Sequence, residues 1–188
     1  EYNLQLQGYV DAFKSAAVQS AITSGNHGRI AVQFVYWSST RRGNRNISAQ
    51  EDMTGWTLID STTSANAFSD ALSLLPRPFS GMTPIGDAIA YGTTQFLGDN
   101  GFEGDRLVMD VSGDGSQNFG GSTSAARDAA LLVIDTINGL PILNDEPNLD
   151  DWYAANVIGG TDAFVLPATS FADFQAAIDA AIDTGITF

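Results

Sequence analysis

Apolar residues recur along this chain at two spacings, and segments of the two kinds alternate. In one kind they return every three or four positions, with polar residues between them, which is typical of amphipathic helices. This pattern predicts helices over residues 1–22, 64–75, 84–97 and 123–133, and a final helix that Ser170 would cap. Phe171, Phe174, Ile178, Ala181 and Ile182 form the apolar face of that last helix.

The other kind of segment is a short apolar run, rich in β-branched and aromatic residues, that is too short for a helix. Such runs are typical of buried strands. They predict strands over residues 30–37, 53–59, 106–112, 136–142 and 162–166. Residues 38–52 are polar and carry three arginines, which predicts a loop or a wide hairpin. An acidic loop over residues 144–151 precedes a short helix that bears Trp152 and Tyr153.

Strands that alternate with helices favour a mostly parallel sheet covered by helices on both faces. We therefore expect an α/β fold with three layers, α-β-α, and a Rossmann-like order of elements. The length of 188 residues, without a convincing linker or internal repeat, predicts a single domain over residues 1–188.

Two stretches are candidates for chemistry. Thr83 and Pro84 precede a predicted helix, where Thr83 can be the N-cap and Pro84 the first helical residue. Asp114 follows an apolar strand, and Ser112 forms an Asp-x-Ser pattern with Asp110. Open α/β sheets bind ligands at the carboxyl ends of their strands. A hydroxyl and a carboxylate brought together there supply half of a hard-cation site.

Each of these residues also has a structural interpretation. Thr83 could be only a helix cap, and Asp114 only a turn residue before a glycine. Asp110 lies inside the strand, where its carboxylate could instead bond to neighbouring backbone or an arginine. Asp87 falls in the first turn of its helix, where a carboxylate suits the helix dipole, and we expect it to be structural.

The segments Thr83-Pro84-Ile85-Gly86-Asp87 and Asp114-Gly115 resemble the second and third metal-site segments of a von Willebrand factor type A domain. Five further stretches are similar to a family of uncharacterised, usually exported bacterial proteins with that fold. They are residues 28–32, 56–60, 110–115, 137–142 and 156–160. The resemblance implies a metal ion-dependent adhesion site with Thr83, Ser112 and Asp114 as ligands. It also implies bound Mg²⁺, with Ca²⁺ or Mn²⁺ as alternatives, and a secreted, periplasmic or cell-surface location.

The sequence departs from that fold in one respect. In the type A fold a central strand precedes the first helix and ends in an Asp-x-Ser-x-Ser loop, and neither is present in these residues. Without that strand its two neighbours keep unpaired backbone groups, each of which costs about 1–3 kcal/mol when buried. We therefore expect a strand from residues before Glu1, or one donated by another polypeptide between residues 30–37 and 106–112.

Charge narrows the choice of partner. The formal net charge is −14, from 22 acidic and 8 basic residues, which argues against nucleic acid as a ligand. The chain has no cysteine, which excludes disulfides and thiol catalysis, and no apolar run long enough to span a membrane. His27 lies in a glycine-rich turn and is expected to be a solvated loop residue.

No set of residues with catalytic spacing is apparent, and we expect that the protein is not an enzyme. The first hypothesis for function is a non-enzymatic, exported module that binds a protein partner through the cation site. The alternative is a structural subunit of a surface assembly, whose central strand is supplied by a neighbouring chain or by a cleaved precursor segment.

Overall fold

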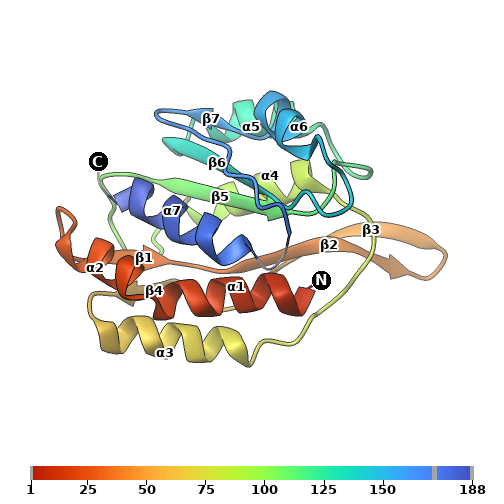
Figure 1. The fold of residues 1–188 in the computed structure, drawn as a ribbon. Coiled ribbons are helices and arrows are strands. Elements are labelled where there is room, and N and C mark those ends of the chain that lie inside the picture. The colour runs from red at the N-terminus through yellow and green to blue at the C-terminus, as the bar shows by residue number, and fades with distance from the viewer. Residues whose placement is uncertain (1, 171–172, 187–188) are drawn as a thin grey trace.

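Helices and strands alternate along the chain, as the apolar spacing predicts. The computed structural model describes residues 2–170 and 173–186 (Figure 1). The helices are α1 (Tyr2–Lys14), α2 (Ala16–Ser24), α3 (Thr62–Ser73), α4 (Ile85–Gln95), α5 (Thr123–Ala130), α6 (Leu149–Asn156) and α7 (Phe174–Ile186). The strands are β1 (Ile30–Val32), β2 (Val35–Arg42), β3 (Arg45–Asp52), β4 (Thr57–Ile59), β5 (Val108–Gly113), β6 (Thr136–Pro141) and β7 (Gly159–Gly160). None of the described helices is long and apolar enough to cross a membrane.

The strands pair in three separate groups. β1 is antiparallel to β4, and β2 forms a hairpin with β3. β5 runs parallel to β6, whose other edge bonds to the short antiparallel β7. The α/β class is therefore confirmed. Within the described residues, however, hydrogen bonds do not join these groups into one mostly parallel sheet, because no ladder connects β1 or β2 to β5.

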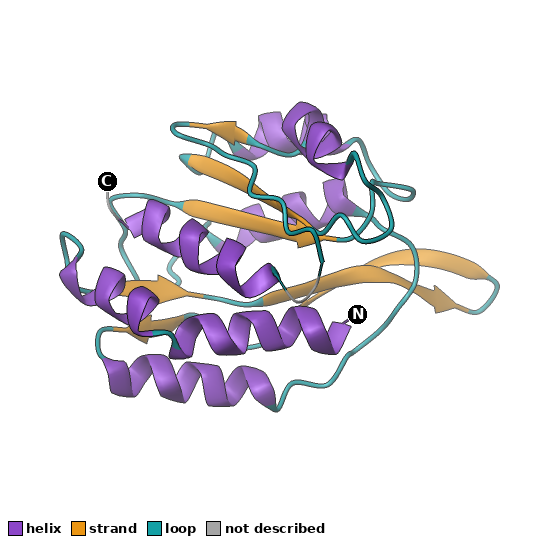
Figure 2. Ribbon diagram, in the orientation of Figure 1, coloured by secondary structure: helices purple, strands orange, loops and turns teal. Residues whose placement is uncertain are grey.

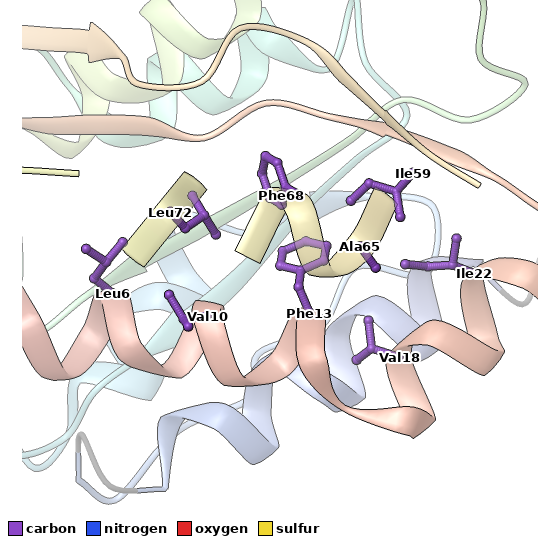
Figure 3. Packing of buried hydrophobic residues seen from close by; sticks show 9 residues of the cluster. All are labelled: Leu6, Val10, Phe13, Val18, Ile22, Ile59, Ala65, Phe68 and Leu72. Atoms are coloured by element: carbon purple, nitrogen blue, oxygen red, sulfur yellow. The ribbon is translucent and has the colours of Figure 1, made fainter. Parts of the chain in front are cut away.

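The helices group on two sides of the strands. α1, α3 and α7 lie together on one side, and α4 and α5 pack against each other on the other side (Figures 1 and 2). Buried apolar side chains form three clusters. The first joins α1, α2, α3 and β4, the second joins α1, β6 and α7, and the third joins α4, β5, β6 and α6. Figure 3 shows the first cluster. In it the rings of Phe13 and Phe68 contact each other edge to face, with their centroids 4.9 Å apart.

Three predictions in the first third of the chain need correction. The helix expected over residues 1–22 is divided at Ser15, whose extended backbone breaks it and whose hydroxyl accepts a hydrogen bond from the Val18 N–H. The strand expected over residues 30–37 is divided into β1 and β2 around Phe34, which bonds instead to residues 53 and 54. Because residues 53 and 54 bond to Phe34, the strand expected over residues 53–59 is shortened to β4. The polar stretch over residues 38–52 is a hairpin, the second of the two predicted forms.

The end of the chain also differs from the prediction. The strand expected over residues 162–166 forms one isolated parallel bridge, at Val165, and a second bridge follows it at Ala168. The short strand β7 lies before it. β7 consists of two glycines, so the sequence contains no apolar or β-branched run that would predict it. The final helix begins at Phe174, and the Ser170 hydroxyl bonds to the Asp173 carboxylate. Phe171 lies outside the described residues, as does the side chain of Ala181.

Candidate functional site

A cleft of about 920 Å³ lies between the β1–β2 segment and β5. Residues of α1, α4 and α7 complete its walls, and we call it the central cleft. Side chains from all three apolar clusters face it, for example Phe13, Leu140 and Ile89. A domain of this size normally has one contiguous core. The cleft therefore lies where the three clusters would otherwise meet.

All three candidate ligands, Thr83, Ser112 and Asp114, line the central cleft. Thr83 comes from the loop before α4, Ser112 from the last residues of β5, and Asp114 from the residue after that strand. The loops are joined through Asn118, whose side-chain oxygen accepts the Thr83 N–H at 2.8 Å. The Asn118 N–H in turn donates to the Thr83 carbonyl at 3.2 Å. The structure thus places the three residues around one space, at the carboxyl end of β5.

Thr83 is not the cap of α4, contrary to the sequence prediction. The N-cap is Pro84, which has no side chain able to accept a hydrogen bond, and the helix begins at Ile85. The amide oxygen of Gln117 instead accepts the Gly86 N–H at 2.7 Å. Because a side chain from another loop caps the helix, the Thr83 hydroxyl is not required for that purpose.

The Ser112 hydroxyl oxygen is already engaged. It accepts hydrogen bonds from the Gln5 amide at 2.8 Å and from the Tyr9 hydroxyl at 2.9 Å. Burial raises the pKa of Tyr9, although its hydrogen bond to Ser112 acts in the opposite direction. These bonds fix α1 against β5. Cation binding by Ser112 would therefore require its oxygen to give up at least one of these two donors.

Asp114 has an unusual neighbour in Tyr153. The Tyr153 hydroxyl is buried and has no hydrogen-bond partner within the described part of the chain. Burial raises the pKa of Tyr153, and the negative charges of Asp114 and Glu146 raise it further. The Glu146 carboxylate accepts the Ser116 N–H at 2.7 Å, which holds the loop after Asp114 in place. A neutral, buried hydroxyl thus lies beside the carboxylate proposed as a ligand.

Asp110 has a hydrogen-bond partner that the sequence did not predict. Its carboxylate accepts a hydrogen bond from the Asn138 amide at 2.9 Å, and the Asn138 oxygen accepts the Phe164 N–H at 3.3 Å. Asp110 lines the central cleft and is exposed there. Desolvation by the surrounding protein raises its pKa, while the bond to Asn138 and the charge of Arg106 lower it. An amide side chain on β6 is therefore a hydrogen-bond partner of Asp110, and the charge of Arg106 acts on the same carboxylate.

Two further predictions are supported by the geometry. Asp87, expected to be structural, accepts the Gly121 N–H at 2.9 Å and holds the glycine-rich loop after β5. His27, expected to be solvated, is exposed, and its Nε2 lies 2.6 Å from the Asp105 carboxylate. Both His27 and Asp105 line the central cleft and come from opposite walls of it. This pair therefore links the two walls near the amino end of β5.

Thr83 and Asp114 could supply part of the coordination shell of a cation. Thr83 and Asp114 offer oxygen donors, the type that Mg²⁺ prefers, and Mg²⁺ commonly retains several waters beside one or two carboxylates. Among the described residues, no group of three or more histidine, cysteine or acidic side chains is placed to hold a metal ion. The rest of a coordination shell would thus have to come from water or from a partner.

The sequence did not reveal Gln117, Asn118 or Tyr153 as parts of this region. Gln117 and Asn118 lie in the polar loop between β5 and α5, where nothing in the local sequence shows which helix terminus or loop their amides contact. Tyr153 was interpreted as an aromatic residue of a short helix. Its place beside Asp114 depends on how α6 packs on β6, which has no signal in the local sequence.

Comparison with known proteins defines the class of fold. The chain shares its fold with proximal thread matrix protein 1 (PTMP1) from the mussel byssus, with a TM-score of 0.60 and 12% sequence identity. The similarity covers 95% of this chain and 41% of the mussel chain, so this chain spans less than half the length of that protein. At this identity the likeness concerns the fold alone.

The family follows from the sequence. Residues 1–187 match the family described as protein of unknown function (DUF1194), and the chain belongs to that family. None of the curated proteins matches it.

Proposed function

We propose that this chain is a non-enzymatic, von Willebrand factor A-like module that binds a protein partner outside the cytoplasm. The observation that carries the proposal is that Thr83, Ser112 and Asp114 line the same cleft, and that Asn118 joins the Thr83 loop to the loop after Asp114. The shared fold with a mussel matrix protein and the resemblance of the Thr83 and Asp114 segments to metal-site segments support it. The site lies where open α/β sheets bind their ligands.

The proposed cation is Mg²⁺, with Ca²⁺ or Mn²⁺ as alternatives. Thr83 and Asp114 would hold it through oxygen, with water in the remaining positions, and a carboxylate of the partner would replace one of these waters. Ser112 would orient this region through its bonds to α1, and it would coordinate only after losing one of them. The cation thus provides the link between partner and domain.

The first prediction concerns direct cation binding. Mg²⁺ at ten times its dissociation constant is expected to stabilise the folded chain by about 1.4 kcal/mol. Asp114→Ala and Thr83→Ala should each remove this stabilisation, because together these residues supply the free oxygen donors. Thermal unfolding with Mg²⁺ and with chelator measures the effect.

Asp150→Ala is the matched control, since it removes a carboxylate from α6 rather than from the central cleft. It should keep the full Mg²⁺ response. An equal Mg²⁺ response in Asp114→Ala and in the unmodified chain would contradict the proposed site.

A second candidate function is favoured by the open strand edges that face the central cleft. Within residues 2–170 and 173–186, β5 pairs with β6 along one edge and has no strand on the other, and β1 pairs with β4 alone. An extended segment between them would pair with both edges and bring the three apolar clusters into contact. In this alternative the protein is a structural subunit, and its central strand comes from another chain or from a cleaved precursor segment.

The second prediction tests strand donation on the 188-residue chain itself. If strands are exchanged between copies, the chain should associate, and amides of β5 that face the cleft should become protected from hydrogen exchange on association. Light scattering after size exclusion, together with hydrogen exchange of residues 108–113, provides the measurement. A monomer with a cooperative unfolding transition and unprotected β5 amides would exclude strand exchange between copies, and it would argue against the need for any donated strand.

A further inference from the structure

Basic residues are scarce in this chain and concentrated at one point. Of eight basic residues, Arg41, Arg42 and Arg45 lie within five positions, which leaves five others against 22 acidic residues. They occupy the end of the β2–β3 hairpin, which projects beyond the rest of the domain (Figure 2). All three side chains are exposed. We call residues 41–45 the hairpin tip.

The arginines of the hairpin tip form no ion pair with any described residue. Within the described part of the chain, none of the three arginines lies within 4 Å of a carboxylate, and the ion pairs found there involve other residues. Arg42 and Arg45 are direct partners across the two strands. Like charges in such positions repel each other and destabilise a hairpin. The Arg42–Arg45 pair therefore destabilises the hairpin. Residues that destabilise a fold in this way are commonly found at binding sites.

The backbone holds this charge in a fixed place. Gly43 has φ +61° at the first central position of the two-residue turn, the position that glycine takes in a type II′ turn. The register is regular over eight residues of each strand. Midway along β2, the Ser39 N–H donates to the Met82 carbonyl at 3.0 Å, and the Ser39 hydroxyl accepts the Met82 N–H at 2.7 Å. Met82 directly precedes the candidate ligand Thr83.

We infer that the hairpin tip binds an acidic, carboxylate-rich segment of the protein partner. The inference rests on the proposed protein-binding function and names the chemistry of the partner. Arginine forms paired hydrogen bonds with carboxylates, and three arginines on a rigid turn present several such donors. The acidic remainder of the surface repels an acidic segment, so such a partner is directed to the hairpin tip. A carboxylate from the same partner could then reach the cation site.

A labelled peptide of alternating glutamate and glycine is the probe, measured by fluorescence anisotropy at low and high salt. Arg42→Gln/Arg45→Gln is expected to weaken peptide binding about 10-fold, since two charge-assisted contacts are lost. Lys14→Gln/Arg29→Gln is the control, because it removes the same charge from sites away from the hairpin. It should change the affinity less than about twofold, a limit set by long-range charge alone.

Three results would overturn the inference. They are equal losses in the two double variants, no peptide binding at low salt, and equally tight binding of a single-stranded oligonucleotide with the same number of charges. The last would assign the hairpin tip to phosphate instead of carboxylate. Thr83→Ala and Asp114→Ala, measured in chelator, should retain peptide binding. The absence of cation binding and the absence of peptide binding at the hairpin tip are thus separate results.

Discussion

Phe68→Ala is expected to lower the free energy of unfolding by about 3–5 kcal/mol, the usual cost of truncating a buried phenylalanine. Phe68 is 3% exposed and contacts Phe13 edge to face, with Leu72 and Ala65 in the same cluster. Its removal leaves a cavity between α1 and α3, and these two helices pack closely along their length. Urea denaturation followed by circular dichroism measures the loss.

Phe102→Ala is the matched control, since Phe102 is 37% exposed in a loop. It should change stability by less than about 0.5 kcal/mol. A loss of similar size in the two variants would mean that the α1–α3 cluster is not a principal source of stability.

Gly86→Ala is expected to lower the free energy of unfolding by about 2–3 kcal/mol, although glycine to alanine usually stabilises a helix. A Cβ at this position would lie 2.5 Å from the Gly121 carbonyl oxygen and 3.0 Å from the Ser122 carbonyl. Both obstacles are backbone, so α4 or the glycine-rich loop must move. Because Thr83 precedes this helix turn, the Mg²⁺ response should weaken as well.

Gly92→Ala in the same helix provides the comparison. Its Cβ would meet the methyl and sulfur of Met109, at 2.9 and 3.4 Å, and that flexible side chain can move away. Stability should therefore change little or increase slightly in chemical denaturation. If Gly86→Ala were equally neutral, the close packing of α4 on the loop after β5 would not restrict the position of Thr83.

Much of the fold was accessible from the sequence, because most elements leave a local signal. The apolar faces of α3 and α4 and the buried runs that became β5 and β6 appear close to their predicted positions. Where local signals were absent, prediction failed. Ser15 breaks a continuous helical pattern through its own side-chain cap, and β7 consists of two glycines. Neither feature changes the periodicity on which the prediction depended.

The candidate site was predictable only in part. The strand-end rule predicts a site at Ser112 and Asp114, which share β5, whereas Thr83 lies in the loop before α4 and was added through the resemblance to a metal-site segment. The capping of α4 by Gln117 and the bonds from α1 to Ser112 depend on contacts between segments far apart in the chain. Such contacts follow from packing, which one sequence does not encode in any local pattern.

The bonds between Ser39 and Met82 have a mechanical consequence. A force on the hairpin tip would pass along β2 to Met82 and, one residue later, to Thr83, the proposed cation ligand. If the hairpin tip and the cation site both bind as we propose, the two binding events influence each other reciprocally, by the same factor in both directions. Force on the hairpin would then change the affinity for the ion without any large rearrangement of the domain.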